Sequence, residues 1–415
     1  MKLKIFRGTN EIGGTCLQLT ASNGKILWVD CGAPLDPRNP DVSYSKGKVD
    51  ALLVSHPHLD HYGLMENIDP TVPIYIGEVA FDFINATKLF IDKPLLSGNY
   101  IDVKPWKSFT ILDTFVVKAY LTDHSTPESF AFQIDVDGKR LYYSGDFRAT
   151  GRKKKLFNNT IKSPPKDIDI LFIEGTMIER ENHKYESEDA IEYGLVELLT
   201  KQENVSFLVS SAQNIDRLTS LIRACKKTGK TVVVDVYTAW LLDMLHKQST
   251  NVPTMDWKEI KVYCHPTQIK KIENKNHQEF HQRVISNSLG NYVFSNPSQF
   301  VYFVRNPNKR LINKLRKNGI INVIYSQWEG YLQDEFEQYF TENLNNLKED
   351  DGISFLSMHT SGHAPLRNLI QFTKAINAKK VVPIHTAYPK KFKNKFEEVG
   401  INNIHLLNDG IEYEL

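Results

Sequence analysis

Short apolar runs that end in polar residues recur along the whole chain. They are 4 to 8 residues long and rich in β-branched and aromatic side chains, which is typical of buried strands. The runs are ILWVD (26–30), ALLVSHPH (51–58), LYYSGD (141–146), ILFIEG (170–175), VSFLVSS (205–211), TVVVDVY (231–237), INVIYS (321–326), ISFLSMH (353–359) and VVPIH (381–385). Layered sheet folds place their functional sites just beyond strand ends, so the polar residues that close these runs are candidates for function.

Helical patterns lie between these runs. Ser187 is a predicted N-cap for the segment 187–199, and Gly229 is a predicted stop for the segment 216–230. Pro365 opens a third helical segment at a first-turn position. Strands dominate the first 150 residues, and strands alternate with helices from about 170 to 330. The pattern predicts a sheet-rich α/β protein that is interrupted by an α/β insertion.

Composition excludes several classes of protein. The 415 residues are 41% hydrophobic and 24% charged, which is ordinary for a globular chain. No apolar run is long enough to span a bilayer, so we expect no membrane partner, and the first residues lack the apolar core of a signal peptide. The four cysteines form no CxxC pair, so a disulfide framework or a thiolate zinc site is not expected, and a cytoplasmic location fits.

The strongest chemical signal is the hexapeptide His56-Pro-His58-Leu-Asp60-His61, which directly follows a predicted strand. Alternate residues of an extended segment share a face, so His56 and His58 can point to one side. The turn that follows can bring Asp60 and His61 to a second position. Imidazole and carboxylate groups are the ligands of open catalytic zinc sites.

This hexapeptide resembles the HxHxDH signature of the metallo-β-lactamase fold. Other motifs of that fold also have counterparts here, in the same order along the chain: Asp30 in WVDCG, His124 in TDHSTPES, Asp146 in YSGDFR and His385 in VVPIHT. The resemblance implies that His124 and His385 are metal ligands and that Asp146 bridges two metals. It also implies that Asp30 binds no metal itself but orients the loop that carries the metal ligands.

The spacing of these motifs resembles the β-CASP branch of the fold, whose members are nucleic-acid hydrolases. His385 comes 239 positions after Asp146, which leaves room for an inserted domain. The motifs of the branch match Glu174 in LFIEGT, His363 in MHTSGHA and His385. The resemblance implies an αββα metallo-β-lactamase sandwich with an inserted α/β β-CASP domain. We expect the sandwich to comprise residues 1–185 and 350–415, and the inserted domain to comprise residues 186–349.

The string HTSGHA (359–364) is similar to the corresponding segment of the ribonuclease J family, and the region after Glu174 resembles the RNA 3′-processing endonucleases. His385 stands where RNA-acting members of the branch carry histidine. The resemblance therefore implies a metal-dependent ribonuclease that acts on single-stranded RNA in RNA processing or decay, as a 5′ to 3′ exonuclease, an endonuclease or both. It places His359, Ser361 and Ser326 among the substrate-binding residues, and a homodimer is a further expectation.

The implied mechanism uses two divalent metals, with zinc expected and manganese as the alternative. One metal would be held by His56, His58 and His124, the other by Asp60, His61 and His385, with Asp146 between them. Asp60 would also accept a hydrogen bond from the attacking water. Glu174 and His363 would together protonate the leaving oxygen.

The net charge of +2 means that a nucleic-acid surface has to be local. Basic residues are clustered at 152–155, 270–271, 305–310 and 390–395, and Arg148 near Asp146 is the expected phosphate contact. A DNA nuclease of the same branch remains an alternative. So do a small-molecule hydrolase of thioesters or lactones and a non-catalytic RNA-binding subunit.

Overall fold

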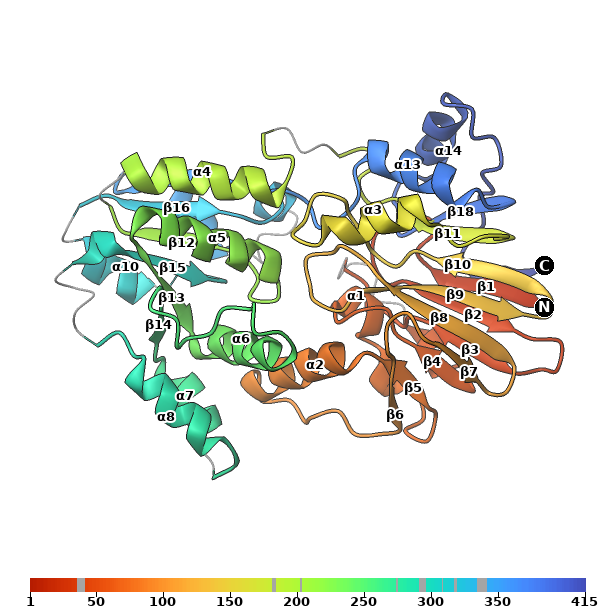
Figure 1. Cartoon of the computed structure of the whole chain (residues 1–415), viewed down its shortest axis with the longest axis horizontal. Helices are drawn as coiled ribbons and strands as arrows, with labels where there is room; N and C mark the ends of the chain where they lie inside the picture. The colour runs from red at the N-terminus through yellow and green to blue at the C-terminus, as the bar shows by residue number, and fades with distance from the viewer. Residues whose placement is uncertain are drawn as a thin grey trace. The chain divides into compact units, whose positions relative to one another are not determined.

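The computed structural model describes residues 1–35, 42–180, 184–201, 204–273, 275–290, 296–307, 309–316, 319–333 and 342–415. The chain divides into two compact units (Figure 1). Unit 1 comprises Met1–Ile84, Leu95–Glu181 and Gly362–Leu415, and unit 2 comprises Asn85–Pro94 and Asn182–Ser361.

Unit 1 contains two sheets. The first has the strand order β19-β1-β2-β3-β4-β5-β6. Its strands are β1 (Lys2–Arg7), β2 (Cys16–Thr20), β3 (Ile26–Val29), β4 (Ala51–Leu53), β5 (Ile74–Ile76), β6 (Tyr100–Asp102) and β19 (Glu412–Glu414). The second sheet has the order β18-β11-β10-β9-β8-β7. Its strands are β7 (Ser108–Ile111), β8 (Phe115–Leu121), β9 (Phe130–Val136), β10 (Lys139–Tyr143), β11 (Ile170–Glu174) and β18 (Lys380–Ile384).

The two sheets of unit 1 pack face to face. Leu17, Leu27 and Leu53 of the first sheet share one buried core with Phe132 and Phe172 of the second. Helices cover the outer faces, where the buried strand residues contact helical side chains. These helices are α1 (Leu59–Tyr62), α2 (Glu78–Phe90), α3 (Lys154–Lys162), α13 (Leu366–Ile376) and α14 (Pro389–Glu397), with the short 3₁₀ turns η1 (Ser43–Lys46) and η2 (Met65–Asn67). The result is the αββα sandwich that the motifs implied.

Unit 2 is built around a sheet with the order β14-β13-β15-β12-β16-β17, in which all neighbouring strands are parallel. The strands are β12 (Ser206–Val209), β13 (Thr231–Asp235), β14 (Ile260–Tyr263), β15 (Phe300–Val304), β16 (Ile321–Tyr325) and β17 (Ile353–Ser357). The central residues of β12, β13, β15 and β16 are buried, as expected for the inner strands of a parallel sheet between layers of helices.

Helices cover both faces of this sheet. They are α4 (Glu188–Lys201), α5 (Ile215–Thr228), α6 (Val236–Gln248), α7 (Pro266–Ile272), α8 (Gln278–Ser286), α10 (Lys309–Leu315) and α12 (Glu342–Lys348), with the turns η3 (Lys275–His277), η4 (Pro297–Gln299) and η6 (Glu329–Leu332). Figure 1 shows α4 and α5 side by side along one face. Helices α10 and α12 pack on the other face through a separate core.

The expected fold class is confirmed, and the local signals for helices mostly have the expected structural role. The Ser187 hydroxyl accepts a hydrogen bond from the Ala190 N–H at the start of α4. Gly229 ends α5 in the left-handed conformation. Pro365 is the N-cap of α13 rather than its first residue.

The two units divide the chain at positions that differ from the domain bounds taken from the motifs. Strand β17 lies within the range 350–415 that we assigned to the sandwich, but it pairs with β16 in the unit 2 sheet. Residues 85–94, at the end of α2, also group with unit 2. The domain bounds 1–185, 186–349 and 350–415 therefore stay a prediction drawn from motif positions.

Helix length and polarity bear on the membrane question. The longest described helices, α4 and α5, have 14 residues each and carry charged side chains. No helix in the described part of the chain is long and apolar enough to cross a bilayer.

Candidate metal centre

The histidines and carboxylates singled out by the motifs lie at the carboxyl ends of strands in unit 1. His56 and His58 follow β4, and Asp60 and His61 lie within the short helix α1. His124 follows β8, Asp146 follows β10, and His385 follows β18. Strands β10, β11 and β18 are parallel, so the residues that follow β10 and β18 reach the same edge of the sheet as Glu174, the last residue of β11.

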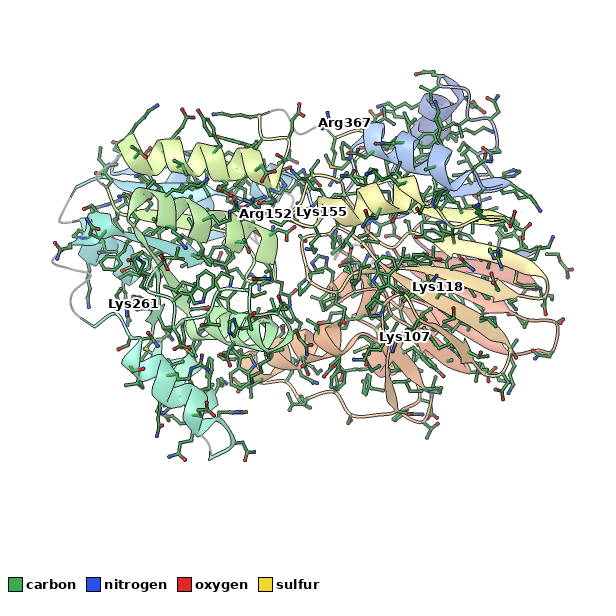
Figure 2. All side chains as sticks on the ribbon, in the orientation of Figure 1. Lys107, Lys118, Arg152, Lys155, Lys261 and Arg367 are labelled. Atoms are coloured by element: carbon green, nitrogen blue, oxygen red, sulfur yellow. The ribbon has the colours of Figure 1, made fainter. Side chains whose placement is uncertain are left out.

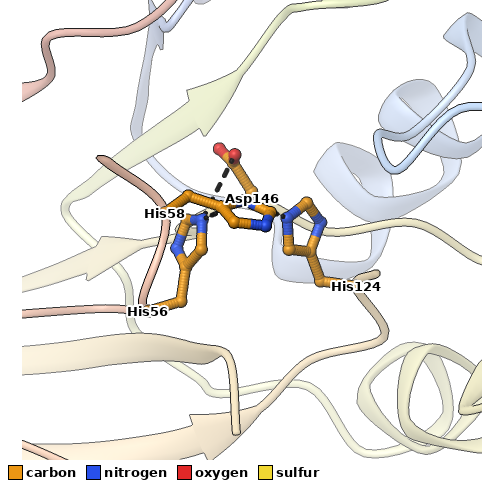
Figure 3. Close-up of side chains that lie close together, drawn as sticks. All are labelled: His56, His58, His124 and Asp146. Carbon is orange, nitrogen blue, oxygen red and sulfur yellow. Dashed lines mark hydrogen bonds and ion pairs between the residues drawn. The ribbon is translucent and has the colours of Figure 1, made fainter. Parts of the chain in front are cut away.

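A first group of side chains brings together His56, His58, His124 and Asp146 (Figure 3). Nδ1 of His58 lies 3.2 Å from Nε2 of His56 and 3.2 Å from Nε2 of His124. Nε2 of His56 is 3.6 Å from Oδ2 of Asp146. One ligand atom from each of the four residues lies within 4.8 Å of those of the others, a spacing at which they could hold one metal ion.

A second group brings together Asp60, His61 and His385. Nε2 of His385 is 3.0 Å from Oδ2 of Asp60, and Nε2 of His61 is 3.9 Å from the same oxygen. Nε2 of His61 also lies 3.3 Å from Oδ2 of Asp146. Asp146 is therefore close to members of both groups, which is the position required of a bridging carboxylate.

Asp30 lies behind the second group and fixes its orientation. Its Oδ2 accepts hydrogen bonds from Nδ1 of His61 at 2.7 Å and from the hydroxyl of Tyr143 at 2.5 Å. Ser55 donates to both oxygens, from its backbone N–H at 2.7 Å and its hydroxyl at 2.8 Å. Because Nδ1 of His61 carries the proton in this pair, its Nε2 lone pair is directed toward the cluster.

His124 and His385 are oriented by partners in the same way. Nδ1 of His124 is 2.7 Å from the carbonyl oxygen of Gly362, which can only accept, so Nε2 of His124 holds the free lone pair. Nδ1 of His385 is 2.9 Å from the hydroxyl of Thr176. His385 and Asp30 both have positive φ, at 50° and 58°. Residues other than glycine rarely adopt this conformation, and the hydrogen bonds offset its cost.

The electrostatic environment favours neutral imidazoles in the first group. Burial lowers the pKa of His56 and of His124, and it lowers the pKa of His58 to about 4. Neutral imidazole is the form that binds metals. In the second group burial lowers the pKa of His61, but the carboxylates of Asp146 and Asp30 outweigh it and raise that pKa.

Several polar atoms of the cluster are buried without a hydrogen bond. Among the described residues, no partner in hydrogen-bond geometry is present for either carboxylate oxygen of Asp146 or for Nε2 of His61. A buried neutral polar group without a hydrogen-bond partner costs about 1–3 kcal/mol of stability. A buried carboxylate without a partner costs more, because it also carries a charge. Divalent cations bound between these atoms would supply the missing partners, so the residues present fit a metal centre.

His363 and Glu174 form a pair next to Asp146. Nδ1 of His363 is 3.3 Å from Oε1 of Glu174 and 3.7 Å from Oδ2 of Asp146. Burial lowers the pKa of His363, but these two carboxylates outweigh burial and raise the pKa to about 8. Glu174 also accepts backbone hydrogen bonds from Ala364 at 3.2 Å and Thr176 at 3.1 Å, which fix its position.

Close backbone contacts around the centre explain two of the glycines in the motifs. A Cβ on Gly32 would lie 1.7 Å from the carbonyl oxygen of Asp60, so the WVDCG loop can approach α1 only with glycine there. Gly145 has φ 53°, and a Cβ on it would lie 2.4 Å from the carbonyl oxygen of Phe130. Both glycines therefore hold ligand-bearing segments in place.

Arg148 is not on the surface where a phosphate contact was expected. Its side chain is completely buried, and its Nε lies 4.0 Å from Oδ1 of Asp123. Asp123 also accepts backbone hydrogen bonds from Gly151 at 2.9 Å and Lys153 at 3.2 Å. The structure thus gives Arg148 a role in packing the 146–153 loop against the residue that precedes His124.

The residues expected to contact substrate in unit 2 belong partly to a buried network. Ser326 is buried, and its hydroxyl is hydrogen-bonded to the Met358 carbonyl and to the guanidinium of Arg217. His359 is half-buried, with Nδ1 at 3.4 Å from the Ser326 carbonyl oxygen, and Ser361 is buried. Arg217 is itself fully buried and pairs with Glu188 at 3.0 Å.

The basic clusters differ in how far their charges are compensated. Figure 2 shows Arg152 and Lys155 at the start of α3 in unit 1, and Lys155 is exposed there. On α14, by contrast, Lys391 and Lys395 lie 2.8 Å and 3.1 Å from the carboxylate of Glu179. Part of that cluster is therefore neutralised within the unit.

Four residues that position the centre were missed by reasoning from the sequence. They are Ser55, Asp123, Tyr143 and Thr176, and each lies within three residues of a motif residue. The sequence signal that could have identified them is a polar side chain at the end of a buried strand, close to a predicted metal ligand. Their partners lie far away in the sequence, so the pattern alone did not specify them.

Comparisons with known proteins agree with this geometry. Residues 28–199 match the beta-lactamase superfamily domain, and residues 356–406 match the Zn-dependent metallo-hydrolase RNA specificity domain. The chain is 22% identical to Ribonuclease J of Mycoplasma pneumoniae, in an alignment that covers 99% of this chain and 72% of that protein. It is 28% identical to an RNase J-like protein of Methanocaldococcus jannaschii, over 42% of each chain.

Two further matches extend the comparison. Endoribonuclease YSH1 of Saccharomyces cerevisiae is 25% identical over 41% of this chain and 25% of that protein. A crystal structure of a protein of unknown function from Enterococcus faecalis V583 superposes with a TM-score of 0.74 at 20% identity, covering 100% of this chain and 99% of the other, and supports the fold alone. The chain therefore carries a beta-lactamase superfamily domain and a Zn-dependent metallo-hydrolase RNA specificity domain, and it resembles Ribonuclease J over 99% of its length.

Proposed function

We propose that this protein is a metal-dependent ribonuclease that hydrolyses phosphodiester bonds of single-stranded RNA at a centre of two divalent metals. The observation that carries the proposal is the convergence of two groups of imidazole and carboxylate ligands on Asp146, with the pair His363–Glu174 beside them. The match to an RNA specificity domain and the names of the relatives favour RNA over other substrates.

In this proposal the ligands divide as the motifs implied. His56, His58 and His124 would hold one ion, and Asp60, His61 and His385 the other, with Asp146 contacting both. Nitrogen and oxygen ligands of this kind suit zinc, and manganese accepts the same set. When bound, the two ions supply Lewis acidity toward the phosphodiester and make water nucleophilic near neutral pH.

The side chains of the protein position the substrate water and the leaving group. Asp60 is proposed to accept a hydrogen bond from the attacking water and so to orient it. Nδ1 of His363 faces Glu174, which leaves Nε2 to offer a proton to the leaving oxygen. The neighbouring carboxylate of Glu174 raises the pKa of His363, which favours the protonated ring that a general acid requires.

The proposal extends to the mode of cleavage. The similarity of the segment 359–364 to ribonuclease J favours a 5′ to 3′ exonuclease that depends on the 5′ end of its substrate. Resemblance to endoribonucleases favours internal cleavage, and one enzyme can combine both modes.

The test is a time course on end-labelled RNA that carries a 5′-monophosphate, a 5′-triphosphate or a 5′-hydroxyl, beside DNA of the same sequence. We expect RNA to be degraded and DNA to be spared, with mononucleotide release that is fastest from the monophosphate. Internal cuts that are insensitive to the 5′ end would contradict the exonuclease mode. Cleavage of DNA alone, or of a thioester or lactone with RNA left intact, would contradict the proposal.

Metal content gives an independent check. Elemental analysis of the purified chain should find two divalent ions per chain in the wild type. Asp146→Asn should retain fewer ions and lose activity. A matched exchange at Asp256, an exposed aspartate of unit 2, should change neither.

A further inference from the structure

We propose that unit 2 carries a second ligand site, a pocket for a single nucleotide at the carboxyl ends of β13 and β15. A cavity of about 190 Å³ opens there. The polar residues that line it are Asp235, Tyr263, His265, Gln268, Tyr302 and Arg305. The site shares no residue with the metal centre, and the inference does not depend on the proposed ribonuclease activity.

The position of the cavity follows from the topology of the sheet. Helix α6 follows β13 and packs with Val232 and Val234 on one face. Helix α10 follows β15 and packs with Val233 and Tyr302 on the opposite face. The chain thus leaves two neighbouring parallel strands in opposite directions, and such a switch point opens a crevice where open α/β sheets bind their ligands.

Tyr302 supplies a second, independent observation. Its side chain lines the cavity and is only 1% exposed, yet its hydroxyl has no hydrogen-bond partner among the described residues. A buried hydroxyl without a partner costs about 1–3 kcal/mol. A ligand atom that accepts from this hydroxyl, or donates to it, would remove that cost.

Part of the polar lining is already fixed. Oδ1 of Asp235 accepts from the backbone N–H of Thr238 at 2.8 Å, and Oδ2 accepts from Nε2 of Gln268 at 2.7 Å. Gln268 in turn accepts from the backbone N–H of Val236 at 3.0 Å. The carboxylate is therefore held in one orientation, and its remaining lone pairs can accept from a ribose hydroxyl or a base amine.

The other walls suit a planar group. Tyr263 and His265 are half-buried, and their ring centroids lie 6.5 Å apart at an interplanar angle of 52°. Val304 and Leu311 add apolar surface. Aromatic side chains stack on bases of any sequence, and this contributes about 1–3 kcal/mol per base.

The charges around the cavity favour a nucleotide over a simple anion such as phosphate. Arg305 is exposed directly after β15, and Lys309 follows at the start of α10. No ion pair involving Arg305 is found in the described part of the chain. Asp235 would repel an anion that entered the cavity. A nucleotide satisfies both conditions, because its phosphate can remain near Arg305 while its uncharged base and sugar enter.

A free mononucleotide and a nucleotide within single-stranded RNA present this same chemistry. The test uses the metal-loaded full chain and four probes: adenosine 5′-monophosphate, uridine 5′-monophosphate, ribose 5-phosphate and a 2′-O-methyl oligoribonucleotide that resists cleavage. Calorimetric titration gives the affinities, and photo-crosslinking of 8-azidoadenosine 5′-monophosphate followed by peptide mapping gives the location. Comparing the mononucleotides with the oligonucleotide distinguishes the two sources.

Two variants test the residues, and a third serves as a control. Arg305→Ala should weaken mononucleotide binding at least tenfold. Tyr302→Phe, which removes only the unpartnered hydroxyl, should weaken it at least threefold without lowering the melting temperature. Lys258→Ala removes an exposed cation of unit 2 that does not line the cavity, and should bind as the wild type does.

Crosslinks to residues 261–268 or 300–306, together with the two losses of affinity, would support the site. Crosslinks confined to other peptides, or unchanged affinity in both variants, would overturn it. Ribose 5-phosphate that competes as well as the mononucleotides would also overturn it, because the base would then make no contribution.

Discussion

The carboxylate of Asp30 is buried and accepts hydrogen bonds from Ser55, His61 and Tyr143. These contacts hold one imidazole in the tautomer that a metal requires. Single side chains elsewhere in unit 1 also set protonation states, as Glu174 does for His363.

Replacing His363 with alanine separates its proposed role from metal binding. We expect turnover of RNA to fall by about 10²–10⁴-fold, the usual contribution of a general acid. The content of divalent ions should stay at the wild-type value, because His363 is assigned to neither metal. Glu174→Gln should act in the same direction through loss of the carboxylate that charges the ring.

Parallel measurement of kcat and of bound metal by elemental analysis decides the point. His363 also lies near Asp146 and His385, in a geometry that could itself hold an ion. Loss of metal together with activity in His363→Ala would therefore show that His363 is a ligand rather than an acid.

Glu128 should make the stability of unit 1 depend on pH. Burial raises the pKa of its carboxyl to about 7, although the carboxyl accepts backbone hydrogen bonds from Val79 at 2.6 Å and Ala80 at 3.1 Å. The folded-state pKa lies above the unfolded value, so the folded state binds the extra proton. Its stabilising contribution is complete below the unfolded pKa and is lost as the pH rises through about 7.

Chemical denaturation of Glu128→Gln across this pH window is the measurement. The free energy of unfolding should decline less steeply with rising pH in the variant than in the wild type. Glu398→Gln, at an exposed position of unit 1, should keep the wild-type slope. Equal slopes in all three proteins would contradict the assignment.

The position of helix α1, which carries two predicted metal ligands, depends on a close contact with the WVDCG loop. The WVDCG loop after β3 touches the start of α1, and Gly32→Ala would place a Cβ 1.7 Å from the carbonyl oxygen of Asp60. We expect the variant to bind fewer metal ions and to melt at a lower temperature, because α1 has to shift together with its two ligands. Gly352→Ala is the matched control, since its nearest neighbours are atoms of the flexible Arg316 side chain.

Elements of unit 2 are joined by Arg217 of α5. Its guanidinium pairs with Glu188 of α4 and donates to the carbonyl oxygens of Ser326 at 2.7 Å and Thr360 at 3.1 Å. Arg217→Ala removes the guanidinium that pairs with the buried carboxylate of Glu188, and this should cost about 3–5 kcal/mol of unfolding free energy. Urea denaturation followed by hydrogen exchange in α4 and α5 would detect it, and a loss below 1 kcal/mol would contradict the network's structural role.

The elements also show how far the sequence could be interpreted. His56, His58, Asp60 and His61 lie within one turn, so their proximity was readable from the chain alone. His124, Asp146 and His385 could be placed only by resemblance, because strand pairing brings them together. Arg148 and Ser326 were expected to contact substrate, but both side chains are buried. Arg148 contacts Asp123, Ser326 contacts Arg217, and nothing in a local pattern specifies these partners.

At the scale of the whole molecule, metals should stabilise one unit and not the other. The ligand groups lie in unit 1, in segments far apart in sequence. Ions that bind only the folded state add stability by mass action. Chelation should therefore reduce amide protection in residues 54–62, 122–126 and 383–386, while the unit 2 sheet stays protected.

Hydrogen exchange with and without chelator measures this difference, and adding zinc back should restore protection. Equal loss of protection in β12, β13 and β15 would show that the two units do not respond separately. No change in unit 1 would count against the metal centre itself.

The wide spacing of the ligands has a consequence for the newly made protein. After Asp146, translation has to add 239 further residues, the last of which is His385. At roughly 5–20 residues per second, this interval lasts about ten to fifty seconds. Throughout that time unit 1 lacks β18 and one member of its second ligand group. A nascent chain therefore has no complete second ligand group until His385 has been added.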